Sequence, residues 1–181
     1  PISSIRPTPT ATPIIISCDK NLDIALMIDR SSSMNETDTG KLKLEWAKEA
    51  AKGFVDAIYN TGTGSVNVAV ASFGAQGNDG TGTIADTSFN STLNSVLVNT
   101  STGYATIVDA INGVNYNKWG TCVECGLKLG NSQLINVNNR KIGVLISDGR
   151  ANHTWNGSNV NGRQAAIAMA NSGRASGIEY R

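Results

Sequence analysis

The chain has 181 residues, of which 40% are hydrophobic and 16% charged, and its formal net charge is +1. A chain so close to neutral offers no electrostatic basis for binding nucleic acid or an anionic membrane. The length suffices for one domain with a substantial core, and no apolar run approaches the ~20 residues that a membrane-spanning helix needs.

The first segment is rich in threonine and proline. Residues 6–13 read RPTPTATP, a composition that prefers extended polyproline-like backbone and has little to bury. We therefore expect residues 1–17 to form a stalk or linker and residues 18–181 to form one domain. A first residue other than Met, without a visible signal peptide, predicts a mature or trimmed product. Stalks of this type are common outside cells, so we expect an extracellular or cell-surface location.

The predicted domain begins with a strand and a helix. Residues 22–29 (LDIALMID) form an apolar run without helical periodicity, which is typical of a strand buried on both faces of a parallel sheet. From residue 41 the chain predicts an amphipathic helix that starts at a cap formed by Asp38 or Thr39. The apolar residues at helical spacing are Ala47, Ala50, Ala51, Phe54 and Ile58.

The remaining elements alternate in type. Residues 65–73 predict a second strand, and residues 83–89 a third that pairs with it as a hairpin. Helices are expected over 106–114 and from about 122 to 134. A buried strand (KIGVLISDG, 141–149), an alanine-rich helix (161–177) and the start of another strand (178–180) follow. This order predicts an α/β, Rossmann-like, doubly wound fold, with a mostly parallel sheet, one antiparallel edge strand and helices on both faces.

Oxygen-bearing side chains follow the predicted buried strands. Asp29 ends the first strand and is followed by Ser31 and Ser33 at alternate positions, while Asp148 ends a later strand and Thr121 opens a predicted helix. Ligands of open α/β sheets bind beyond the carboxyl ends of the strands. Turn formation or capping would explain any one of these residues. As a set of carboxylates and hydroxyls, they suit a hard divalent cation, Mg²⁺ foremost, with Mn²⁺ or Ca²⁺ as alternatives.

Three segments resemble the loops of von Willebrand factor type A domains, the fold that includes the integrin inserted domain. DRSSSM (29–34) is similar to the family's D-x-S-x-S motif, GTCVECGLKL (120–129) to its second loop, and VLISDG (144–149) to its third. The resemblance covers residues 23–180 in the family's order and implies a metal-ion-dependent adhesion site. In such a site the two serines and the threonine bind the ion directly, and the aspartates act mostly through water. The partner supplies an exposed Asp or Glu that replaces a water on the ion.

Three further residues lie beside these motifs as candidate ligand contacts. Arg30 either points away from the ion or pairs with an acidic ligand. Trp119 precedes Gly120 where the family often has two glycines, and it either shields the site or packs against the protein. His153 follows the third loop and either contacts a ligand or is solvated.

Cys122 and Cys125 form a C-x-x-C pair at a predicted helix start. We interpret them as a local disulfide or two free thiols. Redox catalysis is disfavoured because the motif does not follow a strand as in thioredoxin, and zinc would need further soft ligands. Cys18 lies at the opposite end of the first strand, about seven residues or ~23 Å away at ~3.3 Å per residue. A bond between Cys18 and the pair is therefore not expected.

The resemblance implies an adhesion or protein-binding module on the cell surface. We expect no enzyme, because no hydroxyl or thiol has a base near it in the sequence. Two alternatives stay open: a structural module of a surface filament or pilus, and an intracellular type A domain that partners an ATPase. The family fold continues beyond a strand such as 178–180 with a final strand and helix. We therefore expect a further segment or another chain to complete the sheet.

Overall fold

The computed structural model describes residues 21–61, 64–75, 96–116, 120–155 and 161–181. The predicted stalk, Cys18, the strand predicted at 83–89 and Trp119 lie outside the described residues.

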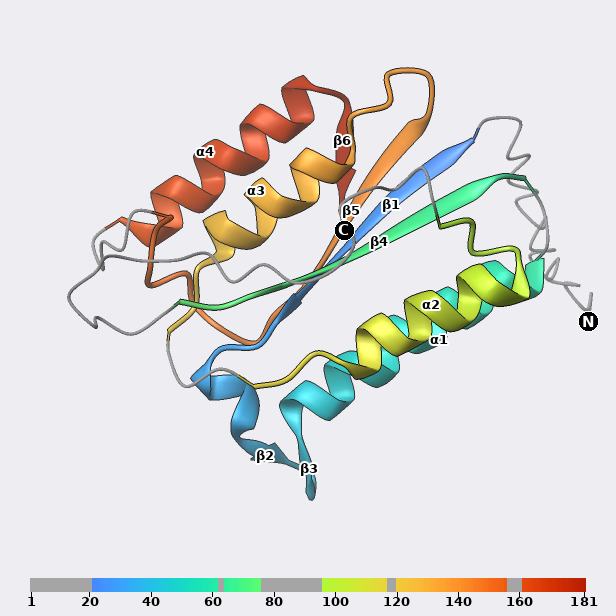
Figure 1. The fold of residues 1–181 in the computed structure, drawn as a ribbon. Helices are drawn as coiled ribbons and strands as arrows, with labels where there is room; N and C mark the ends of the chain where they lie inside the picture. Colours follow the sequence, from blue (N-terminus) through green and yellow to red (C-terminus); the bar gives the residue numbers. More distant parts are fainter. Residues whose placement is uncertain (1–20, 62–63, 76–95, 117–119, 156–160) are drawn as a thin grey trace, which may run out of the picture.

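A four-stranded parallel sheet forms the centre of the domain (Figure 1). Its spatial order is β4-β1-β5-β6, and each neighbouring pair is parallel. The strands are β1 (Leu22–Asp29), β4 (Val66–Phe73), β5 (Arg140–Ile146) and β6 (Ile178–Tyr180). The predicted α/β fold with a mostly parallel sheet is confirmed. The central place of β1 explains its unbroken apolar sequence, because both of its faces are covered.

The two faces of β1 contribute to different parts of the core. Ile24, Leu26 and Ile28 pack in one cluster, while Met27 packs in another cluster on the opposite face. Leu26, Met27 and Ile28 are each 0% exposed. Burial of an aliphatic side chain of this size contributes about 1.5–3 kcal/mol relative to exposure, so this strand holds both layers of the domain together.

Helices cover both faces of the sheet (Figure 1). α1 (Lys43–Thr61) and α2 (Ser101–Asn112) pack on one face, and α3 (Val123–Gln133) and α4 (Gly162–Ala175) on the other. α2 begins before the predicted residue 106, because the Thr100 side chain accepts a hydrogen bond from Gly103 N at 3.0 Å and caps the helix there. None of the helices in the described ranges is long and apolar enough to cross a membrane.

The start of α1 differs from the prediction. Residues 37–38 (β2, Thr37–Asp38) and 41–42 (β3, Lys41–Leu42) form a small antiparallel pair, so neither Asp38 nor Thr39 caps the helix. Thr39 instead adopts a φ of 51° in the turn between them. The two-residue ladder holds the backbone at 41–42 in an extended form, and the helix begins only at Lys43.

The buried face of α1 also differs from the prediction. Ala50 and Phe54 are exposed. The residues of α1 that enter the core are Leu44, Ala47, Ala51 and Val55. The helix is thus rotated so that Leu44 and Val55 supply most of the apolar surface that it buries against the sheet.

Antiparallel pairing occurs on the side of β4 that faces away from β1. Asn67 and Leu97 form an isolated antiparallel bridge. Val98 N donates to Val66 O at 3.0 Å, and Val68 N donates to Val96 O at 3.3 Å. Residues 96–98 therefore supply antiparallel contacts at this edge of the sheet.

Candidate metal centre

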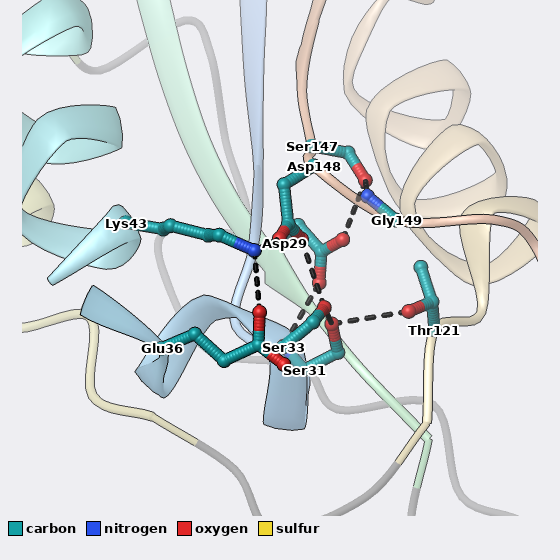
Figure 2. A network of polar contacts seen from close by, with 9 residues as sticks. All are labelled: Asp29, Ser31, Ser33, Glu36, Lys43, Thr121, Ser147, Asp148 and Gly149. Atoms are coloured by element: carbon teal, nitrogen blue, oxygen red, sulfur yellow. Dashed lines mark hydrogen bonds and ion pairs between the residues drawn. The ribbon is translucent and has the colours of Figure 1, made fainter. Parts of the chain in front are cut away.

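The side chains of Asp29, Ser31, Ser33, Thr121 and Asp148 meet at the carboxyl ends of β1 and β5 (Figure 2). We call these five residues the oxygen cluster. After Asp29 the chain turns at once into a short 3-10 helix, η1 (Ser32–Asn35). Thr121 immediately precedes Cys122, the N-cap residue of α3, and Asp148 follows β5. Three chain segments thus contribute to one small volume.

The hydroxyls of the oxygen cluster form a chain that ends at a carboxylate. Thr121 Oγ1 donates to Ser31 Oγ at 3.0 Å, and the Ser31 and Ser33 Oγ atoms are 3.2 Å apart. Ser33 Oγ then donates to Asp148 Oδ1 at 2.8 Å. The structure therefore brings together the residue set that the sequence singled out.

These distances allow a test of whether the cluster fits a cation. Adjacent ligands of an octahedral Mg²⁺ with bonds of ~2.1 Å lie ~3.0 Å apart. The separations between the three hydroxyls, 3.0 Å and 3.2 Å, match that spacing, and Asp148 Oδ1 lies beside them, 2.8 Å from Ser33 Oγ. The donors are all hard oxygens, as Mg²⁺, Mn²⁺ and Ca²⁺ prefer. Both the geometry and the chemistry of the cluster fit a hard divalent cation.

Asp29 is the buried carboxylate of the cluster, at 0% exposure. Its Oδ1 accepts a hydrogen bond from Ser31 N at 2.8 Å, and its Oδ2 accepts one from Ser147 Oγ at 2.5 Å. Burial raises the pKa of Asp29 above its usual value, an effect increased by the charge of Asp148 and opposed by the hydrogen bonds from Ser147 and Ser31. The carboxylate therefore fixes the backbone of the serine loop, and its negative charge favours a cation nearby.

Asp148 lies beyond the end of its strand. β5 ends at Ile146, and Ser147 and Asp148 are exposed residues, so the prediction that Asp148 occupies the last position of a buried strand is wrong. The strand ends because the chain turns here: Gly149 N donates to Ser147 Oγ at 3.1 Å. Ser147, which sequence reasoning missed, links this turn to Asp29. Ser147 is the first residue of the S-D-G motif, which could have indicated that it belongs to the site.

Lys43 and Glu36 extend the polar network outward (Figure 2). Lys43 Nζ is 2.7 Å from Asp148 Oδ2 and 2.6 Å from Glu36 Oε2. The hydrogen bonds to Asp148 and Glu36 raise the pKa of Lys43. Neither residue was predicted, because at the sequence level both read as ordinary polar positions near a helix start.

The loop that holds Thr121 is tied to the segment after β5. Thr121 N donates to Asn152 Oδ1 at 2.7 Å, and Thr121 O accepts from Asn152 N at 3.0 Å and from His153 N at 3.1 Å. His153 Nδ1 lies 2.8 Å from the same Asn152 oxygen. A Cβ at residue 120 would lie less than 3.0 Å from His153 Nδ1, so the absence of a side chain at Gly120 lets the His153 ring pack against this loop. His153 therefore supports the Thr121 loop, and Asn152 joins the site as a residue that the sequence did not indicate.

Arg30 is directed toward the segment after α2. Its Nη1 donates to Asn115 O at 3.2 Å, and its backbone N donates to Phe73 O at 2.8 Å. Burial lowers the pKa of its guanidinium. These two contacts connect the chain just before η1 with β4 and with the segment after α2.

A disulfide joins Cys122 and Cys125 at the start of α3, with their Cα atoms 5.2 Å apart. This confirms the disulfide interpretation of the C-x-x-C pair. Both cysteines are 0% exposed, so the protein shields the bond from external thiols. Within the described ranges, no three His, Cys, Asp or Glu side chains come together as a metal-binding group. The hydroxyls are therefore essential to any cation site at the oxygen cluster.

Comparison with known proteins adds a family match. The model of the von Willebrand factor type A domain matches residues 24–150, well over half of the 181-residue chain. No curated protein matches the sequence.

Solved structures with a similar fold come from several surface and matrix proteins. The pilus adhesin SpaC of Lactobacillus rhamnosus GG is 20% identical, with a TM-score of 0.65, and the match covers 90% of this chain and 24% of that protein. Proximal thread matrix protein 1 of the mussel byssus is 22% identical with a TM-score of 0.60, over 92% of this chain and 36% of that one. An adhesive tip pilin of Group B Streptococcus agalactiae is 17% identical with a TM-score of 0.56, over 75% and 47%. This chain therefore spans a quarter to a half of these proteins.

Proposed function

Because the chain belongs to the von Willebrand factor type A family, we propose that it is an extracellular adhesion module that binds an acidic group of a protein partner through a divalent cation. The oxygen cluster holds the cation, for which Mg²⁺ is the first choice and Mn²⁺ or Ca²⁺ are alternatives. The proposed role is binding, without a chemical step on the partner.

One observation supports the proposal most directly. Oxygen atoms from the loops after β1, before α3 and after β5 lie 2.8–3.2 Å apart in succession, which is the spacing of ligands around one small cation. Hydrogen bonding alone would also hold three hydroxyls together. It would not require a buried Asp29 carboxylate behind them and an Asp148 carboxylate beside them.

The residues of the oxygen cluster have different roles in the proposed site. Ser31, Ser33 and Thr121 offer neutral oxygens, so they compensate little of the charge of a bound cation. Asp29 positions Ser31 by accepting a hydrogen bond from its backbone N, and it contributes a negative charge on the buried side of the cluster. A bound divalent cation would supply the Lewis acidity that attracts a carboxylate. The acidic side chain of the partner would complete the coordination.

A second candidate is a module inside a surface filament or pilus, in which the same chemistry faces a neighbouring subunit. The similar solved structures support it at least as well, because they include a pilus adhesin and an adhesive tip pilin. Both candidates place the protein outside the cell and use the same site. They differ in whether the partner belongs to the same assembly or to another cell or surface.

A further part of the proposal concerns the side of the sheet next to α1. Ile142, Val144 and Ile146 of β5 are only partly buried there. On α1, Trp46 is 45% exposed and Phe54 37% exposed. We propose that additional polypeptide, from a continuation of the chain or from another chain, covers this apolar surface.

The test is isothermal titration of Mg²⁺ into matched serine variants. Ser33→Ala removes a cluster hydroxyl, whereas Ser32→Ala removes an exposed hydroxyl from the adjacent residue. Thr121→Val tests the second loop. We expect Ser33→Ala and Thr121→Val to weaken binding at least tenfold and Ser32→Ala to leave it unchanged. Equal binding by Ser33→Ala and Ser32→Ala would show that the cluster is not the cation site.

A further inference from the structure

Lys43 brings a positive charge into direct contact with the oxygen cluster. As the first residue of α1, it extends along the edge of the site so that its ammonium lies 2.7 Å from Asp148 Oδ2 (Figure 2). The other oxygen of the same carboxylate accepts the hydrogen bond from Ser33. The Asp148 carboxylate thus contacts both the Ser33 hydroxyl and the Lys43 ammonium.

Glu36 offers the ammonium a second partner. Its Oε2 lies 2.6 Å from Lys43 Nζ, and the Glu36 side chain is 65% exposed, so it stands on the outer side of the ion pair. Glu36 directly follows η1, the short helix that carries Ser33. Lys43 therefore keeps one ionic contact even if Asp148 turns toward a cation.

The formal charges of the four ionisable groups around the cluster sum to the charge that a divalent cation would neutralise. Asp29, Asp148 and Glu36 are acidic and Lys43 is basic, which leaves two net negative charges when all four are ionised. A divalent cation would bring this sum to zero. Without Lys43 the same site would carry an additional negative charge and would attract the cation more strongly.

On the basis of the proposed cation site, we propose that Lys43 is a built-in competitor for Asp148 that lowers the affinity of the oxygen cluster for divalent cations. Glu36 acts as the relay that receives the ammonium when the cation binds. Lys43 is thereby an affinity-determining residue and not a ligand. With Lys43 present, the site therefore fills only at higher concentrations of the divalent cation than the cluster alone would need.

The size of the effect follows from electrostatics. A unit charge and a divalent charge ~6 Å apart in a water-like dielectric repel each other by an amount equal to about tenfold in Kd. The water-like value is a lower bound, because the side chains of the ion pair reach solvent only in part, with exposures of 29% for Lys43 and 20% for Asp148. Salt screens part of this repulsion, so the measurement belongs at low ionic strength.

The experiment is Mg²⁺ titration by calorimetry into wild type and three single variants of residue 43 or its surroundings. Lys43→Gln removes the charge, and Lys43→Arg keeps it. Lys48→Gln is the matched control, since Lys48 lies on the same helix and pairs with Glu45 at 3.2 Å, away from the cluster. We expect Lys43→Gln to bind Mg²⁺ at least about tenfold more tightly than wild type. Lys43→Arg and Lys48→Gln should stay within about twofold of it.

Glu36→Gln tests the relay. With Glu36 neutralised, the ammonium depends on Asp148 alone, so Mg²⁺ binding should weaken. In the Lys43→Gln background the same change should have a smaller effect, and the double-mutant cycle measures the difference. Equal effects of Glu36→Gln in both backgrounds would overturn the relay.

The results separate this inference from the proposed function. If wild type binds Mg²⁺ and Lys43→Gln binds it equally or more weakly, the competitor role is wrong while the cation site stands. If neither wild type nor Lys43→Gln binds Mg²⁺, the cation site is wrong and the competitor role falls with it. Thermal melts of each variant without Mg²⁺ show that the fold is retained.

Discussion

Gly149 leaves room for the Thr121 hydroxyl, and its replacement by alanine should weaken cation binding. A Cβ at residue 149 would lie 2.8 Å from Thr121 Oγ1, against 3.4 Å for an ordinary contact, so the hydroxyl must move by about 0.6 Å. A metal ligand tolerates displacements of only about 0.2 Å. Loss of one polar contact to a charged group costs about 1.5–3 kcal/mol, which corresponds to about ten- to hundredfold in Kd.

Calorimetric titration of Mg²⁺ into Gly149→Ala measures this loss directly. Gly53→Ala is the control, because a Cβ at residue 53 would meet nothing within 4 Å. Gly53 lies inside α1, so that substitution should stabilise the fold by about 0.5–1 kcal/mol and leave Mg²⁺ binding unchanged. Unaltered Mg²⁺ affinity in Gly149→Ala, with the fold intact, would refute the placement of Thr121 among the cation ligands.

Two further predictions concern stability. Burial raises the pKa of Asp29 above 3.8 in the folded protein, so without divalent cations wild type should lose stability relative to Asp29→Asn as pH rises from 3.8 through the raised value. Mg²⁺ at a hundred times Kd should restore about 2.7 kcal/mol to wild type and much less to Asp29→Asn. Thermal melts of both proteins at pH 4 and pH 7, with and without Mg²⁺, test both statements. A wild type that gains stability relative to Asp29→Asn between these pH values without Mg²⁺ would contradict the first, and equal stabilisation of both proteins by Mg²⁺ would contradict the second. Cys122→Ser with Cys125→Ser opens a loop of sequence separation 3 and should lower the free energy of unfolding by about 2 kcal/mol. Urea denaturation measures this, and an unchanged midpoint would count against it.

The sequence was informative where one local pattern decides the outcome. The apolar runs at 22–29 and 65–73 correspond to β1 and β4 because strands buried on both faces need no polar alternation. Asp29, Ser31, Ser33 and Asp148 were predicted because they follow such strands, and parallel strands end at a common edge. Thr121 was predicted because its segment opens a helix and resembles the family's second loop. The disulfide between Cys122 and Cys125 was one of two readings that the spacing allowed.

Tertiary contacts decided what the local patterns left open. The buried face of α1 depends on which side chains the sheet accepts, so Val55 is buried while Phe54, beside it in sequence, is exposed. Lys43 reaches Asp148 across 105 residues of chain, and the Asn152 side chain reaches Thr121 N across 31. Side-chain types alone do not reveal such pairs, because their distance is set by the packing of whole helices and strands. The sequence by itself thus predicted the parallel strands and the set of oxygen-bearing side chains that cluster at their ends, whereas only the folded structure placed the Lys43 ammonium and the Asn152 side-chain amide beside them.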